Sequence, residues 1–201
     1  MPKTVKNVYY KYLTYENLMK AHKKSQKGKT NRKNVIKFNF KQEEYIQWLY
    51  EKLKTKTYKH GGYTEFYVTE PKLRKIEASC YMDRIVHRWC VDSFLEKYFV
   101  PQFIDNSYAC IKGKGMHRAA LDVQKAMKKC KKQYGEYYIL KMDIAKYFAN
   151  INKNKLFEIL KRKVKDENLV WLLHEIIYSK KEEKGIPIRK FNKSNFCKYI
   201  L

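Results

Sequence analysis

The sequence KMDIAKYFANIN, residues 141–152, places one acidic residue inside an apolar run. Asp143 follows Tyr137–Leu140 and is flanked by Met142 and Ile144, a pattern that predicts a buried strand ending near the acid. Burying an unpaired carboxylate is costly. Asp143 is therefore expected either beside a cation of the protein or at the edge of a sheet where a positive ligand binds.

Composition indicates a polyanionic partner. The chain has 201 residues, enough for one domain with a real core or two small ones. Its 45 Lys and Arg against 20 Asp and Glu give a formal net charge of +25. The 18 Tyr and 10 Phe add rings on which unstacked bases could pack, which favours nucleic acid. An AT-rich genome would account for part of this composition but not for the one-sided charge.

The cysteines indicate reduced thiols rather than zinc or disulfides. No two of the five have C-x-x-C spacing, and the N-terminus has no apolar signal segment. No stretch is long and apolar enough to span a membrane. We therefore expect a cytoplasmic protein without a membrane partner.

Periodicity predicts an α+β chain in which helices and short strands are segregated. A basic, mostly helical lead-in over 1–34 begins a helix after Thr14. Short strands are expected at 35–40, 60–70 and 71–79, the last two as a hairpin, and at 137–144. Helices are expected at 41–55, 81–99, 116–133, 153–164 and 167–179, with a loop over 100–115.

Taken alone, the pair Asp143 and Phe148 is ambiguous. A carboxylate at a strand end beside an aromatic ring suits a Mg²⁺ and nucleotide site, yet Mg²⁺ needs one or two carboxylates plus substrate phosphates. An Asp that caps a turn is the alternative.

Several stretches together resemble the reverse transcriptases of bacteria, of the retron, group II intron and diversity-generating retroelement kind. YYILKMDIAKYFANINKNKLFEIL at 137–160 is similar to their first catalytic motif. RKIEASCYMDRIVHRWCVDSFLEKYF at 74–99 and FIDNSYACIKGKGMHRAALDVQKAM at 103–127 are similar to the fingers motifs that precede it. GIPI at 185–188 resembles the start of the motif that follows. The resemblance runs from about residue 9 to 188, in matching order and spacing.

The resemblance implies an RNA-directed DNA polymerase with a right-hand fold, in which 35–135 are fingers and 136–188 a partial palm. Asp143 and the backbone carbonyl of Ile144 would bind two Mg²⁺ ions for attack of a primer 3′-hydroxyl on a dNTP. The partners implied are an RNA template, a DNA primer and dNTP, with an element-encoded RNA or an accessory protein as further candidates.

The same resemblance implies roles for other residues. Phe148 would lie under the sugar of the incoming nucleotide and exclude a 2′-hydroxyl, and Lys72 with Arg74 would grip the triphosphate. Lys112, Lys114 and Arg118, which we call the basic loop cations, would contact the template backbone; a solvated basic face is the alternative. Many relatives have Arg where this chain has Ile111.

Other candidate residues have plainer explanations. Arg84 is expected to pair with Asp83 or a helix neighbour as readily as with substrate. His87 and His117 are expected to pack or to form hydrogen bonds rather than to bind ligands. The aromatic residues Trp89, Phe94 and Phe99 are expected in the core.

The chain departs from the family after GIPI, where RKFNKSNFCKYIL occupies 189–201. Codons allowed for this stretch, read from their second base, encode GNLTSQIFANI, the sequence expected in the family. We therefore expect a frameshifted tail from a one-base insertion and a fold truncated before the remaining catalytic carboxylates and the thumb. Polymerase activity of these residues alone is expected to be negligible.

Two alternatives remain open. A non-catalytic RNA-binding remnant or maturase-like module needs neither Asp143 nor Phe148. A DNA-binding helix bundle, such as a transposon regulator, explains the charge but not the strand motif.

Overall fold

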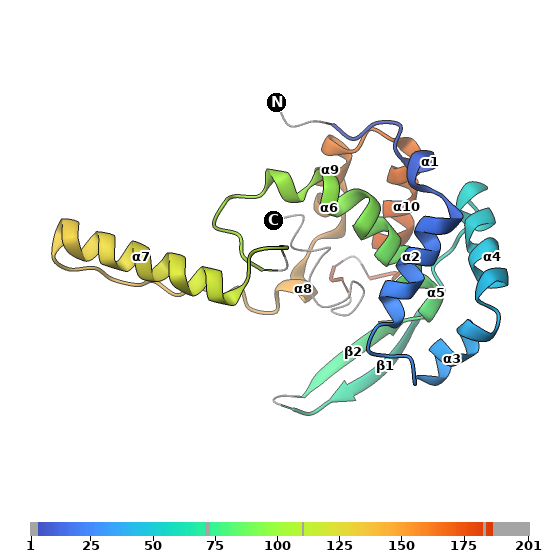
Figure 1. Cartoon of the computed structure of the whole chain (residues 1–201), viewed down its shortest axis with the longest axis horizontal. Coiled ribbons are helices and arrows are strands. Elements are labelled where there is room, and N and C mark those ends of the chain that lie inside the picture. Colours follow the sequence, from blue (N-terminus) through green and yellow to red (C-terminus); the bar gives the residue numbers. More distant parts are fainter. Residues whose placement is uncertain (1–3, 71–72, 110, 183, 187–201) are drawn as a thin grey trace.

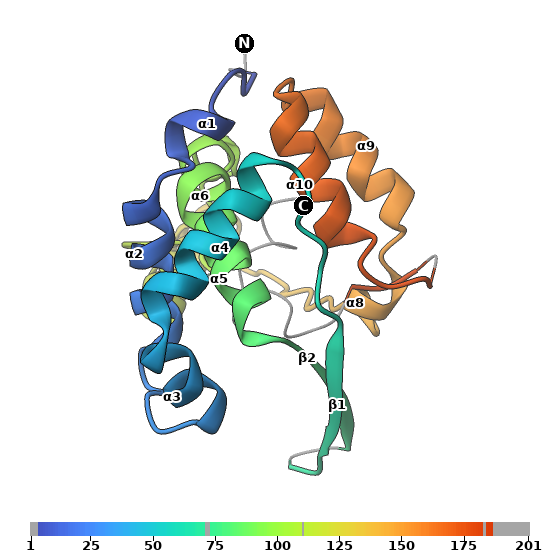
Figure 2. The same cartoon turned by 90° about the vertical axis from the view of Figure 1, so that its right-hand side faces the viewer.

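The computed structural model describes residues 4–70, 73–109, 111–182 and 184–186. These residues form an α+β structure: a helical body, a two-stranded hairpin that projects from it, and a long arm (Figures 1 and 2). Among the described helices, none is both long and apolar enough to cross a membrane.

The N-terminal part is helical, comprising α1 (Tyr9–Tyr12), α2 (Tyr15–Gln26), α3 (Lys33–Phe40) and α4 (Gln42–Lys54). The predicted cap is confirmed, because the Thr14 hydroxyl accepts a hydrogen bond of 3.2 Å from the amide of Asn17. The strand predicted at 35–40 is wrong. Val35 and Phe38 lie three residues apart and are both buried, which is helical spacing, so burial overrode the β propensity of the segment.

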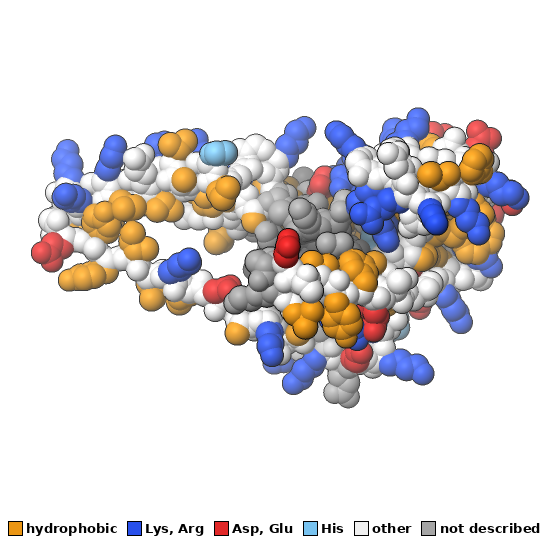
Figure 3. Space-filling view, turned by 90° about the horizontal axis from the view of Figure 1, so that it is seen from below, with side chains coloured by type: hydrophobic (Ala, Val, Ile, Leu, Met, Phe, Trp, Pro, Cys, Tyr) orange, Lys and Arg blue, Asp and Glu red, His pale blue; other side chains and the backbone are white. Residues whose placement is uncertain are grey.

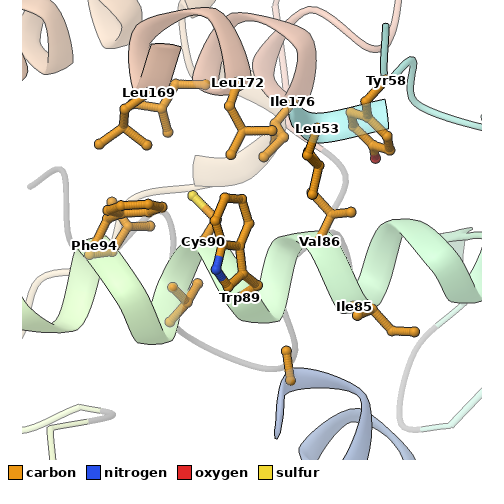
Figure 4. Packing of buried hydrophobic residues seen from close by; sticks show 14 of the residues in the cluster. Leu53, Tyr58, Ile85, Val86, Trp89, Cys90, Phe94, Leu169, Leu172 and Ile176 are labelled. Carbon is orange, nitrogen blue, oxygen red and sulfur yellow. The ribbon is translucent and has the colours of Figure 1, made fainter. Parts of the chain in front are cut away.

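The long helix predicted at 81–99 forms the centre of the body. It comprises α5 (Tyr81–Cys90), the π-helical turn η1 (Val91–Leu95) and α6 (Glu96–Tyr98), followed by the 3₁₀ turn η2 (Val100–Gln102). Trp89, Phe94 and Phe99 are buried, as predicted. In Figure 4, Val86 and Cys90 of this helix point toward Leu53 of α4 and Leu172 of α10. The Trp89 indole donates to the Tyr12 carbonyl at 2.9 Å.

Two antiparallel helices, α9 (Lys153–Lys163) and α10 (Glu167–Ile177), complete the body (Figure 2). Asp166 joins them to the N-terminal segment. One carboxylate oxygen accepts from the amides of Val8 and Tyr9 at 2.7 and 2.8 Å, and the other caps α10.

The predicted hairpin is confirmed. Strand β1 (Tyr63–Val68) pairs antiparallel with β2 (Arg74–Ser79), from Tyr63 opposite Ser79 to Val68 opposite Arg74. It extends away from the helical body (Figure 1).

The arm consists of α7 (Met116–Tyr134) and the segment 136–144, which runs back alongside it to the short helix α8 (Tyr147–Asn150) (Figure 1). The strand predicted at 137–144 is wrong, because no residue of 136–144 pairs with a strand. A strand forms only where a neighbour takes its backbone hydrogen bonds, and the described residues place none beside it. Its apolar side chains are exposed, and Figure 3 shows apolar side chains along the arm.

Candidate nucleotide and nucleic-acid site

Asp143 is exposed at the end of the arm segment, immediately before a sharp turn. Lys146 has left-handed backbone angles, with φ 48° and ψ 38°, and immediately precedes α8. The Lys146 carbonyl accepts from the amides of Ala149 and Asn150 at 2.9 and 3.2 Å. The Asn150 side chain donates to the Ala145 carbonyl at 3.2 Å. This turn redirects the chain between Asp143 and the helix that carries the aromatic pair.

Phe148 lies on α8, where it is half-buried and packs against the main core. Its ring centroid is 5.5 Å from that of Tyr147, at an interplanar angle of 68°. The backbone carbonyl of Phe148 accepts a 2.9 Å hydrogen bond from the amide of Ile186. The position of Phe148 is therefore fixed from both the core and a segment almost forty residues later in the chain.

That later segment, 184–186, lies directly against residues 148–152. Besides the contact to Phe148, the amide of Gly185 donates to the Ile151 carbonyl at 2.9 Å, and Lys184 forms a β-bridge with Asn152. Gly185 has φ +87°, and a Cβ there would lie 3.1 Å from the Ala149 carbonyl oxygen. Both observations favour glycine at this position.

Lys153, the first residue of α9, is buried with its ammonium inside this region. Its Nζ donates to the backbone carbonyls of Lys180 and Glu182, at 3.0 and 2.5 Å. Desolvation lowers the pKa of Lys153, and the charge of Glu182 partly opposes that effect. The ammonium therefore holds the segment that precedes residues 184–186.

The same segment contacts the hairpin. The Tyr63 hydroxyl of β1 lies 2.6 Å from Ser179 Oγ, and the Lys180 ammonium pairs with Glu77 of β2. Lys180 also pairs with Glu182 at 3.0 Å. Desolvation would lower the pKa of Lys180, but the hydrogen bonds to the two glutamates raise it, so this cation stays charged.

Of the two predicted triphosphate cations, Arg74 is the first residue of β2. Lys72 is outside the described residues, as is the side chain of Arg74, whose backbone pairs with Val68. Their role stays a prediction.

The basic loop cations lie at the start of the arm. Lys112 is exposed. The Lys114 ammonium donates to the Asp105 carbonyl and lies 5.9 Å from the centroid of the Tyr108 ring. Arg118 pairs with Asp122 at 2.9 Å within α7.

Tyr108 completes this arrangement by donating to the same carboxylate oxygen of Asp122 at 3.0 Å. Desolvation acts in the opposite direction, but the Tyr108 hydrogen bond and the Arg118 charge lower the pKa of Asp122. Part of the charge of the basic loop is thus used to shape the loop itself.

The residues expected to hold magnesium do not form a metal site by themselves. Asp143 and the Ile144 carbonyl are on one exposed segment, and the described residues contain no group of three or more His, Cys, Asp or Glu that could hold an ion. One carboxylate without substrate phosphates is a weak Mg²⁺ site. Further carboxylates would have to come from outside this arrangement.

At the base of the hairpin, the buried carboxylate of Asp83 forms the centre of a polar cluster that sequence reasoning did not find. Asp83 accepts from the Tyr58 hydroxyl at 2.6 Å, the Gly61 amide at 3.0 Å and Cys80 Sγ at 3.1 Å. His60 Nδ1 lies 3.4 Å from the same carboxylate. Desolvation and the adjacent carboxylate raise the pKa of the Cys80 thiol to about 11, so the group is a hydrogen-bond donor and not a nucleophile.

The sequence left open the roles of Arg84, His87 and His117, and the structure shows the neighbours of the first two. The Arg84 guanidinium donates to the Ser79 carbonyl at 2.9 Å. His87 is buried, and its ring stacks on His60 with centroids 5.3 Å apart, whereas His117 is exposed on α7. Lys153 gave no sequence signal, because only its contacts to carbonyls about thirty residues away reveal its role, whereas Gly185 belongs to the GIPI stretch noted in the sequence.

Comparison of the sequence with models of protein families and with curated proteins gives no match. The assignment of function therefore depends on the residues and their arrangement.

Proposed function

We propose that the chain is the fingers and first palm segment of an RNA-directed DNA polymerase of the reverse transcriptase kind. The observation that carries this proposal is the Asp143–turn–Phe148 arrangement, preceded by the fingers-like motifs and followed by the glycine segment in the expected order. A turn fixed by Lys146 and Asn150, with the aromatic ring held from the core, is consistent with a nucleotide site. That the chain has a right-hand polymerase fold is part of the proposal.

In this proposal the basic loop and the arm bind the RNA template. Exposed cations neutralise phosphates, and the affinity falls as salt rises. The exposed rings of the arm, such as Tyr134 and Tyr138, offer surfaces on which unpaired bases stack. The abundance of cations over the whole chain supports binding to the phosphate backbone of RNA independently of its base sequence.

Asp143 would be the metal-binding and catalytic carboxylate, and Phe148 would select the deoxyribose. Mg²⁺, where bound, would neutralise the charge on the triphosphate and the attacking oxygen. Because the described residues bring a single carboxylate to this point, we expect the 201 residues alone to bind RNA without extending a primer.

The proposal is tested by measuring RNA binding and primer extension on the same protein. Asp143→Ala is expected to leave RNA affinity unchanged, because the residue would serve catalysis and not the template. Replacing Lys112, Lys114 and Arg118 by alanine is expected to weaken RNA binding roughly tenfold or more at 0.1 M salt.

A variant with the same charge loss serves as the control. Lys20, Lys23 and Lys27 are exposed on or just after α2, and their replacement by alanine also removes three positive charges. Equal weakening by both triple variants would mean that net charge alone binds the RNA, and the template role of the basic loop would be wrong.

One observation favours the second candidate, a non-catalytic RNA-binding module. Asp143 is exposed and the described residues supply no companion carboxylates. Deoxynucleotide binding separates the two, because an RNA-binding module has no reason to recognise a dNTP.

A further inference from the structure

Lys153 is a buried cation at a position where a cation is unfavourable. It is 1% exposed, and it is the first residue of α9, where the partial charge of the helix end is positive. Burying an ammonium is costly unless hydrogen bonds compensate for the loss of water. The compensation comes from the two backbone carbonyls of Lys180 and Glu182.

Those carbonyls belong to a segment with contacts on both sides of Lys153. On one side, Ser179 and Lys180 contact Tyr63 and Glu77 of the hairpin. On the other side, Gly185 and Ile186 donate to the carbonyls of Ile151 and Phe148. The ammonium therefore lies at the point where the hairpin contacts and the Phe148 contacts meet.

We propose that Lys153 is a positioning residue that couples the β1–β2 hairpin to the Phe148 turn, and thereby sets the geometry in which a deoxynucleoside triphosphate is held between them. The inference deepens the proposed function and rests on it for the identity of the ligand. Lys153 itself contacts neither nucleotide nor metal in this account. It acts through the carbonyls of residues 180 and 182.

The proposal can be tested specifically, because the acceptors of the Lys153 ammonium are the backbone carbonyls of Lys180 and Glu182. Because they are backbone carbonyls, no side-chain substitution at 180 or 182 removes them, whereas loss of the ammonium removes both hydrogen bonds at once. Lys153→Met keeps the length of the side chain and deletes its donors. Lys155→Met is the matched control, because Lys155 is exposed on the same helix.

The first measurement is amide hydrogen exchange, which needs no ligand. The amides of Gly185 and Ile186, and those of Ala149 and Asn150 in the turn, are expected to exchange roughly tenfold faster in Lys153→Met, because two hydrogen bonds to a charged group are lost. Lys155→Met is expected to leave all four unchanged. Unchanged exchange in Lys153→Met at either pair of amides would overturn the coupling.

The second measurement is titration with dTTP and Mg²⁺ in the presence of an RNA–DNA primer template. Lys153→Met is expected to bind dTTP at least about fivefold more weakly while its affinity for the template stays that of the wild type, which a general loss of structure would not produce. If Lys153→Met shows faster amide exchange but binds dTTP as tightly as the wild type, the positioning role is wrong. If the unmodified protein does not bind dTTP, the proposed nucleotide site fails, and exchange in the turn alone decides the coupling.

Discussion

Asp166→Asn tests how the N-terminal segment is held on the body. Oδ2 of Asp166 accepts from the amides of Val8 and Tyr9 at 2.7 and 2.8 Å, and Oδ1 caps α10 through Asn168 and Leu169 at 3.1 and 3.2 Å. Asparagine is as good an N-cap as aspartate, so the substitution can keep the α10 contacts. What it loses is the second oxygen and the charge.

The expected cost follows from the two lost hydrogen bonds. Each bond to a charged acceptor contributes about 1.5–3 kcal/mol, and a buried donor left without a partner costs further free energy. The new amide group would also face two backbone donors. Because Asp166 is only 4% exposed, water cannot readily replace the oxygen, and we expect a loss of about 3–5 kcal/mol in the free energy of unfolding.

Urea denaturation followed by tryptophan fluorescence measures this loss, because Trp89 is in the core that Tyr9 contacts. Asp105→Asn is the control, since Asp105 is exposed and the substitution keeps the backbone carbonyl that accepts from Lys114. We expect the control to change stability by less than about 0.5 kcal/mol. A cost below about 1 kcal/mol for Asp166→Asn would refute the argument that its carboxylate holds the N-terminal segment.

Four further predictions concern the glycine segment, the thiols, pH and salt. Gly185→Ala is expected to lower the free energy of unfolding by about 1–3 kcal/mol more than Gly28→Ala, because both glycines have positive φ but only Gly185 would bring a Cβ within 3.1 Å of the Ala149 oxygen; equal costs in urea denaturation would contradict this. At pH 8, Cys80 is expected to react with iodoacetamide roughly a hundredfold more slowly in the folded protein than in guanidinium, because its pKa is raised to about 11; mass spectrometry of the alkylated peptide measures both rates. Stability is expected to fall as pH rises from about 8.5 toward 11, because desolvation raises the pKa of Cys80 and raises that of Cys90 to about 12, so the unfolded chain releases these protons first; a thermal midpoint that stays constant or rises over this range, in circular dichroism, would be the wrong sign. In fluorescence anisotropy, log affinity for single-stranded RNA is expected to fall linearly with log salt, with a slope reduced by about 2 in the triple variant of the basic loop; an unchanged slope would place the phosphate contacts elsewhere.

The parts of the fold that could be predicted are those encoded by local patterns. Val86, Trp89 and Phe94 recur at helical spacing, and all three are buried on the central helix. Gly61 and Gly62 precede an alternating stretch, and a hairpin follows. In both cases a pattern within one short stretch of sequence was enough to predict the element.

The failures arose where the surroundings decided the structure. Residues 35–40 are rich in β-branched and aromatic residues, yet the burial of Val35 and Phe38 made them helical. Residues 137–144 have the composition of a buried strand, but a strand needs a neighbour, and the described residues place none there. The same reason leaves Asp143 on an exposed segment rather than at a sheet edge.

Part of the candidate site was proposed from the sequence, and its role stays a prediction. The sequence identified Asp143 and Phe148, and the structure adds the turn between them and the segment packed behind Phe148. Lys153 could not be found from sequence, because a lysine at a helix start is normally solvated, and its acceptors are backbone carbonyls about thirty residues away. Every residue has a backbone carbonyl, so an acceptor of this kind cannot be recognised in the sequence.

The central claim is that the Phe148 ring shapes a pocket for a deoxyribose, and comparing dUTP with UTP binding on an RNA–DNA primer template tests it most directly, because the two differ only at the 2′ position. Wild-type protein is expected to favour dUTP, and Phe148→Ala is expected to bind the ribonucleotide almost as well, because the ring that excludes the 2′-hydroxyl is gone. Equal binding of the two nucleotides by the wild type, or a preference that survives Phe148→Ala, would contradict the account.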